Sequence, residues 1–249
     1  MHHHEKLRMA HMLASVGVDV IEAGFPIASA GDFASVRSIA QEVGTGAGAP
    51  CIAALARAKQ GDIETAARSI EGAHRGRIHT FLATSDLHLE AKLRISRAEA
   101  LDQTAAMVRL ACSYAQDVEF SAEDATRSDL DFLVKIVTIA IQAGATTINL
   151  PDTVGYTTPA EYKALFEHMR AYVPGADQVI FSTHCHDDLG MATANAIAGV
   201  LGGARQVEVT VNGIGERAGN AALEEVAAAM MVRRDRLPFT NNILSLIHI

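Results

Sequence analysis

The chain has 249 residues, the usual size of one β/α barrel, and 49% of them are hydrophobic, which is ample for a large core. Its formal net charge of −8 excludes the basic face that nucleic acids and anionic membranes require, so we expect neither as a partner. The three cysteines share no CxxC spacing, and the sequence has neither an apolar signal peptide nor a membrane-spanning run, so we expect a cytoplasmic protein.

Apolar, β-branched runs alternate with amphipathic helical stretches along the whole chain. After an opening helix over residues 4–15, strands are predicted at 18–24, 51–55, 77–82, 117–121, 146–150, 178–183 and 206–211. Helices are predicted after these strands, at 32–43, 63–70, 98–115, 130–143, 160–172, 192–201 and 221–234. Strict alternation of this kind predicts a parallel sheet with right-handed crossovers.

Seven strands preceded by a helix predict a TIM (β/α)8 barrel that lacks its first strand. The alternative is an open, doubly wound sheet. It is disfavoured because none of the predicted strands is followed by a glycine-rich phosphate-binding fingerprint. We assign residues 1–243 to one barrel domain and expect the apolar tail, 244–249, to be non-native or disordered.

Polar side chains collect where the predicted strands end and loops begin. In a barrel these positions converge on one rim, where active sites are built. The residues at this predicted rim are Glu22, His79, Ser121, Glu123, Asp152, Thr153, His184, His186, Asn212, Glu216 and Asn220.

His184 and His186 are two residues apart at the end of a strand. Period-two alternation places both imidazoles on one face, close enough to bind a common ion, while Cys185 points to the opposite face and fills the core. In the alternative interpretation, both histidines are hydrogen-bonded to Asp187 and Asp188 and bind no metal.

The loop that follows the next strand, 212–220, carries three glycines, two amides, an acid and a base. Asn220 either places its side-chain oxygen on the metal or caps the helix that follows. Two imidazoles with oxygen ligands suit Zn²⁺ or Mn²⁺, and the sequence does not choose between them.

Four ordered motifs resemble those of the 2-isopropylmalate synthase family: VDVIEAGFP at 18–26, LPDTVGY at 150–156, HCHDDLG at 184–190 and NGIGERAGN at 212–220. The resemblance covers about residues 5–243. The stretches 77–85 and 119–125 favour the isopropylmalate member over the citramalate and homocitrate synthases, which remain alternatives.

The resemblance implies a metal-dependent Claisen condensation of acetyl-CoA, as co-substrate, with 3-methyl-2-oxobutanoate, which opens leucine biosynthesis. It implies a divalent metal (Mn²⁺, Zn²⁺ or Mg²⁺) held by His184, His186 and Asn220. It further implies that the oxo acid is bound by residues that include His79, Ser121 and Thr153. The candidates for the catalytic base are Glu123 and Glu216, each of which has the alternative role of ordering a neighbouring ligand or loop.

The sequence departs from the family at its ends. The family's first strand carries an Arg-Asp-Gly-x-Gln motif, whose Asp ligates the metal and whose Arg faces the developing oxyanion, and residues 1–17 do not contain it. The C-terminal leucine-responsive region is also missing. We therefore expect a catalytic-domain fragment, strands 2–8, of a homodimeric enzyme, with little activity of its own. A retro-aldol acyl-CoA lyase, a metal-dependent hydrolase and an inactive binding module are the competing interpretations.

Overall fold

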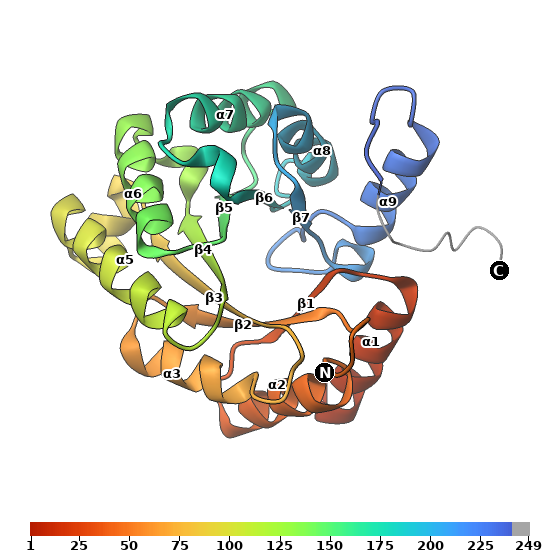
Figure 1. The fold of residues 1–249 in the computed structure, drawn as a ribbon. Coiled ribbons are helices and arrows are strands. Elements are labelled where there is room, and N and C mark those ends of the chain that lie inside the picture. The colour runs from red at the N-terminus through yellow and green to blue at the C-terminus, as the bar shows by residue number, and fades with distance from the viewer. Residues whose placement is uncertain (241–249) are drawn as a thin grey trace.

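Parallel strands form one curled sheet in the computed structural model, which describes residues 1–240 (Figure 1). The sheet has seven strands, and each pairs with its neighbours in sequence order. They are β1 (Val20–Gly24), β2 (Cys51–Arg57), β3 (Gly76–Ala83), β4 (Asp117–Glu123), β5 (Thr147–Asp152), β6 (Ile180–Cys185) and β7 (Gln206–Glu208).

Helices cover the outside of the curled sheet and connect successive strands (Figure 1). The longer ones are α1 (His3–Val16), α2 (Ala30–Glu42), α3 (Gln60–Ser69), α5 (Arg97–Cys112), α6 (Leu130–Ala143), α7 (Pro159–Tyr172), α8 (Ala192–Gly202) and α9 (Leu223–Val232). Short turns of helix lie in the connections: α4 (Asp86–His88), the π-helix η1 (Leu89–Leu93), and the 3₁₀ turns η2 (Ala125–Arg127), η3 (Ala176–Gln178) and η4 (Val211–Gly213).

The sequence of α6 shows why these elements form. Asp129 caps the helix by accepting the Phe132 N–H at 2.9 Å, and Gly144 ends it in a left-handed conformation, φ 113°. Phe132, Leu133, Ile136, Val137 and Ala140 repeat at helical spacing and are buried against the sheet. The whole of β5 is also buried, as expected for a strand whose two faces are both covered.

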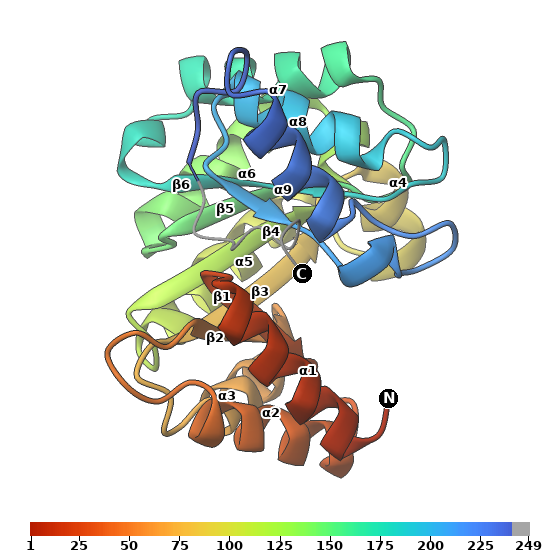
Figure 2. The same ribbon diagram turned by 90° about the vertical axis from the view of Figure 1, so that its right-hand side faces the viewer.

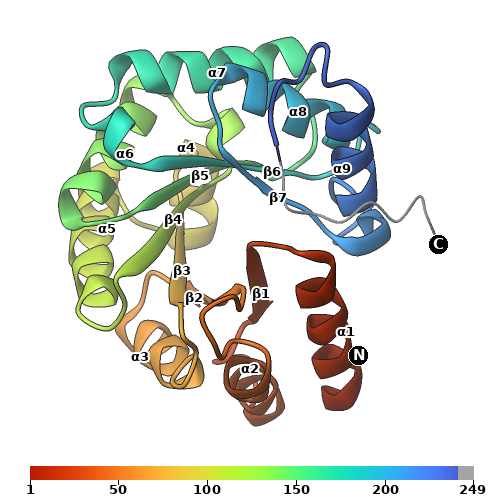
Figure 3. The same cartoon turned by 45° about the vertical axis from the view of Figure 1, so that its right-hand side comes forward.

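The predicted fold class is confirmed. The chain forms a curled half-barrel, and β1 and β7 stand at the two ends of the strand order with an opening between them (Figure 3). Helices α1 and α9 lie on the two sides of this opening and face the viewer in Figure 2. The predicted tail, 244–249, and the last residues of the predicted domain lie outside the described residues.

The structure corrects three expectations from the sequence. Strand β7 ends at Glu208 rather than at residue 211, because the chain turns into η4, where Asn212 has a left-handed φ of 57°. The short helices α4 and η1 were not predicted. Glu22, His79 and Ser121 lie within their strands and not at the strand ends.

In the described part of the chain, no helix is long and apolar enough to cross a membrane.

Candidate metal site

The end of β6 brings the two predicted metal-binding histidines together. The Nε2 atoms of His184 and His186 are 3.1 Å apart, on the same face of the strand. Two nitrogens at this separation fit coordination of one ion at about 2.0–2.1 Å each. Cys185 points to the other face and is buried, and burial raises the pKa of its thiol. The thiol is therefore part of the core, as the alternation predicts.

Asn220 reaches the histidines from the loop between β7 and α9. Its backbone forms an antiparallel bridge with His186, and its Nδ2 lies 3.4 Å from His184 Nε2. Rotation of the amide by 180° would present its oxygen instead. A Cβ at Gly215 would lie 1.7 Å from Asn220 Oδ1, so this close approach requires glycine. The residue that caps α9 is Ala222, so the alternative role of Asn220 as a helix cap is wrong.

The other nitrogen of each imidazole has a charged partner. His184 Nδ1 lies 2.7 Å from Glu208 Oε2, and His186 Nδ1 lies 2.9 Å from Arg217 Nη2. Burial alone would lower the pKa of His184, but the Glu208 carboxylate outweighs it and raises that pKa. Burial, His184 and Arg217 together lower the pKa of His186 to about 4, which keeps this imidazole neutral. The histidines thus contact Glu208 and Arg217, while Asp188 forms an ion pair with Arg217.

A second group of polar residues lies inside the barrel. His79 is buried, with Nδ1 against the Glu22 carboxylate and Nε2 2.7 Å from Ser121 Oγ. Ser121 Oγ also accepts a hydrogen bond of 2.8 Å from Asn149 Nδ2. Burial lowers the pKa of His79, but Glu22 and Glu119 more than compensate and raise it to about 10. The imidazole is therefore a buried cation near neutral pH.

His79, Glu119 and Glu208 offer a second set of ligand atoms, all within 4.8 Å of one another. These residues already have protein partners: Glu119 Oε2 is 2.7 Å from Arg77 Nη1, and Glu208 Oε2 is 2.7 Å from His184 Nδ1. In contrast, the Nε2 atoms of His184 and His186 face each other and Asn220, and neither contacts a carboxylate of the described residues. They fit a divalent metal better, so we take them as the candidate site.

The remaining predicted residues lie on loops and strand ends around this centre. Thr153 Oγ1 accepts the Asp124 N–H at 3.0 Å. Glu123 pairs with Lys92 at 2.5 Å. The Glu216 side chain is 81% exposed and pairs with Arg217 at 3.5 Å. The structure thus places His184, His186 and Asn220 together and His79 with Ser121, and leaves the other three at the periphery.

Sequence reasoning gave no site role to Glu208 or Arg217, which contact the histidines directly. Glu208 stands opposite His184 in the register of β6 and β7. Its signal is the one acid of the predicted strand 206–211, which is informative only when the pairing register is known. Arg217 lies in the glycine-rich loop with φ 53°, and it contacts two segments outside that loop: His186 and Asp188 after β6, and the Thr153 carbonyl after β5.

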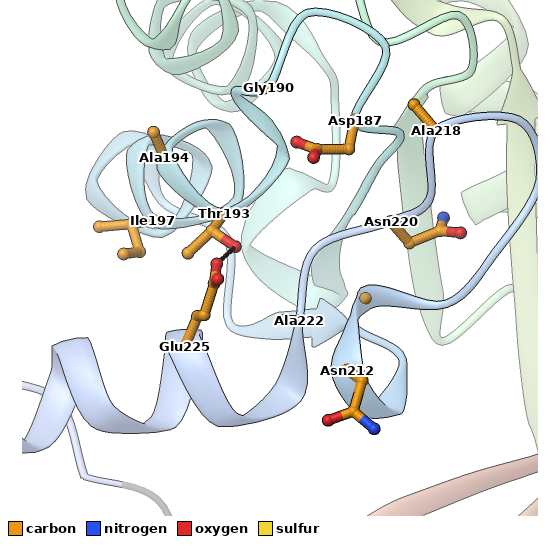
Figure 4. A pocket seen from close by; sticks show the side chains of 11 residues that line it. Asp187, Gly190, Thr193, Ala194, Ile197, Asn212, Ala218, Asn220, Ala222 and Glu225 are labelled. Atoms are coloured by element: carbon orange, nitrogen blue, oxygen red, sulfur yellow. Dashed lines mark hydrogen bonds between the residues drawn. The ribbon is translucent and has the colours of Figure 1, made fainter.

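A pocket of ≈ 510 Å³ adjoins the candidate site on the side of α8 and α9 (Figure 4). Asn220 is the one residue of the predicted metal set that lines it. A hydrogen bond of 2.6 Å from Thr193 to Glu225 crosses it and connects the two helices. Asp187 also lines this pocket.

Comparison with known proteins gives a consistent result. The chain matches the HMGL-like family over residues 1–248. It is 58% identical over 243 residues to a 2-isopropylmalate synthase of Caulobacter sp. (strain K31), covering 98% of this chain and 46% of the relative. It is 56% identical over 241 residues to the synthase of Rhodopseudomonas palustris (strain BisB5), covering 97% and 45%. The resemblance predicted from the four motifs is confirmed, and the chain spans about half the length of these relatives.

Solved structures agree on the fold. A hydroxymethylglutaryl-CoA lyase of Pseudomonas aeruginosa superposes with a TM-score of 0.79 at 22% identity, covering 98% of this chain and 82% of that one. The corresponding lyase of Bacillus subtilis gives a TM-score of 0.79 at 19% identity, with the same coverage. Likeness at this level of identity establishes the barrel architecture alone.

Proposed function

Because the chain belongs to the HMGL-like family, we propose that it forms the metal-binding part of a 2-isopropylmalate synthase. The reaction is the condensation of acetyl-CoA with 3-methyl-2-oxobutanoate. The observation that carries the proposal is the convergence of two imidazole Nε2 atoms, 3.1 Å apart, with the amide of Asn220 at the end of β6. Sequence identity of 55–58% to proteins of that name supports it.

His184, His186 and Asn220 would hold the metal. When bound there, a divalent cation would act as a Lewis acid on the ketone of the 2-oxo acid. Imidazole with amide oxygen suits Mn²⁺ or Zn²⁺ and also permits Mg²⁺. Glu208 and Arg217 would set the orientation of the two rings, because each contacts one Nδ1.

We assign binding of the oxo acid to His79, Ser121 and Thr153. His79 is a buried cation within the barrel, and its positive charge would favour a carboxylate placed beside it. Ser121 would support this contact, since it already bonds to His79 Nε2. Thr153 directly follows β5, and its carbonyl oxygen accepts a hydrogen bond of 2.8 Å from Arg217 Nη2.

The condensation needs a base that removes a proton from the acetyl methyl group. The resulting enolate carbon bonds to the ketone carbon, the ketone oxygen gains a proton, and hydrolysis of the thioester releases CoA. Glu123 and Glu216 remain the candidates for the base. The Glu123 carboxylate is half-buried and held by Lys92, whereas Glu216 is exposed on the loop that carries Asn220.

The first test is release of free CoA from acetyl-CoA by the protein that carries this chain, with a panel of 2-oxo acids. Preference for 3-methyl-2-oxobutanoate over pyruvate and 2-oxoglutarate is expected. Preference for either of the others would reassign the substrate to the citramalate or homocitrate reaction. Cleavage of a hydroxyacyl-CoA without condensation would identify a lyase. Size measurement of the same protein tests the expected homodimer.

The second test addresses the metal ligands themselves. His184→Ala and His186→Ala should each abolish stoichiometric binding of Mn²⁺ or Zn²⁺, because each removes one nitrogen donor. His11→Ala is the matched control, since it removes an exposed histidine of α1. Wild-type metal content in both site variants would overturn the assignment.

A further inference from the structure

The hydrogen bonds around the two histidines have a defined direction. Arg217 has donors only, and its Nη2 lies 2.9 Å from His186 Nδ1 as well as within 2.9 Å of the Thr153 carbonyl and Asp188 Oδ2. His186 Nδ1 faces this donor and must therefore be the unprotonated, accepting nitrogen of the ring. A neutral imidazole that accepts at Nδ1 carries its proton on Nε2. His186 Nε2 therefore donates across 3.1 Å to His184 Nε2. His184 must then carry its own proton on Nδ1, where it donates to Glu208 Oε2 at 2.7 Å.

We propose that Glu208 is a positioning residue that fixes His184 in the Nδ1–H tautomer and leaves the Nε2 lone pair directed at the candidate metal position. This inference rests on the proposed metal site. Carboxylates that accept the second ring N–H of a metal-binding histidine fix both its tautomer and its orientation. Glu208 has the geometry for this role, because it stands directly opposite His184 in the β6–β7 register.

Glu208 is itself held by a network that extends across the barrel interior. Ser182 Oγ donates to Glu208 Oε1 at 3.4 Å, and Gln206 Nε2 donates to Ser182 Oγ at 3.0 Å. Gln206 Nε2 also donates to Glu119 Oε1 at 2.8 Å, and Arg77 extends this hydrogen-bond network through its salt bridge to Glu119. Both carboxylate oxygens of Glu208 therefore have a protein partner, which limits the positions that this side chain can take.

The two histidines therefore differ in how they are prepared for a ligand. His184 Nε2 already has the lone pair that a metal requires. His186 Nε2 carries a proton, and coordination through it requires that proton to move to Nδ1, which now faces the donor of Arg217. Glu208 thus supports ligation by one histidine, and no equivalent acceptor contacts Nδ1 of the other in the described part of the chain.

The test compares Glu208→Met, which keeps the volume but removes the acceptor, with Glu208→Gln, which keeps a carbonyl oxygen. Glu225→Gln is the control, because this exposed glutamate on α9 bonds to Thr193 and not to either histidine. The first readout is the ¹⁵N chemical shift of the His184 ring nitrogens in the metal-free protein, at a pH where the ring is neutral. The second is the affinity for Mn²⁺ by calorimetry.

We expect the Nδ1–H tautomer in the wild-type, Glu208→Gln and Glu225→Gln proteins, and a mixture of tautomers in Glu208→Met. Mn²⁺ affinity should fall about 10- to 100-fold in Glu208→Met and stay within about threefold of wild type in the two Gln variants. A wild-type His184 with its proton on Nε2 would overturn the inference even if Glu208→Met does not fold.

Failure of the proposed metal site has a different signature. If wild-type protein and His184→Ala bind Mn²⁺ equally, or neither binds it, the site itself is wrong. If His184→Ala loses Mn²⁺ while Glu208→Met binds like wild type, only the positioning role of Glu208 is wrong.

Discussion

Tyr162 offers a sharp test of how the fold holds the end of β6 in place. This residue of α7 is fully buried. Its hydroxyl group donates to the Leu150 carbonyl oxygen at 2.6 Å and accepts the His184 N–H at 3.3 Å. One hydroxyl group therefore connects a helix to two neighbouring strands, beside the predicted metal ligand.

The perturbation is Tyr162→Phe, which keeps the ring in its packing against Phe166 and removes only the hydroxyl group. The loss leaves a buried carbonyl oxygen without this donor, at a cost of about 1–3 kcal/mol. In a chain of 249 residues, each kcal/mol lowers Tm by about 2–4 °C. We therefore expect Tm to fall by roughly 2–12 °C.

The assay is urea denaturation and thermal unfolding of Tyr162→Phe, with Tyr156→Phe as the control variant. Tyr156 also donates its hydroxyl to a backbone carbonyl, that of Thr126 at 3.1 Å, but its side chain is 46% exposed. Water replaces that bond, so Tyr156→Phe should change the free energy of unfolding by less than about 0.5 kcal/mol. Equal losses in the two variants would refute the reasoning that burial sets the cost.

Two further predictions concern packing and pH. Gly199→Ala should destabilise the fold by about 1–3 kcal/mol in urea denaturation, because the added Cβ would lie 2.5 Å from Thr183 Cγ2. In the control Gly61→Ala, the added Cβ meets nothing within 4 Å, so this variant should be neutral or slightly stabilising. The pKa of His79 is raised from its ordinary 6.5 to about 10, so its protonation stabilises the fold fully below pH 6.5 and this contribution is lost as the pH rises toward 10. The stability difference between wild type and His79→Gln should therefore shrink between pH 6 and pH 9.5, and a constant difference would contradict the assignment.

Local patterns in the sequence were sufficient for the strand order and for the histidine pair. Period-two alternation is a property of one strand, so the shared face of His184 and His186 and the burial of Cys185 could be derived without knowing what lies beside β6. The role of Glu208 could not be derived in this way. Its contact with His184 depends on the register between β6 and β7, and a shift of one residue would turn Glu208 to the other face.

The position of Asn220 beside the histidines could not be derived from the sequence pattern. Its loop contains glycines, which indicate unusual backbone conformations but not the direction in which the loop folds. That direction comes from backbone hydrogen bonds to the end of β6: Asp187 N–H donates to the Gly219 carbonyl at 2.9 Å, and Ala221 N–H donates to the Cys185 carbonyl at 3.1 Å. These two bonds flank Asn220 and place it opposite His186. The third predicted ligand is thus positioned by main-chain pairing between segments some thirty residues apart, which no side-chain pattern in either segment encodes.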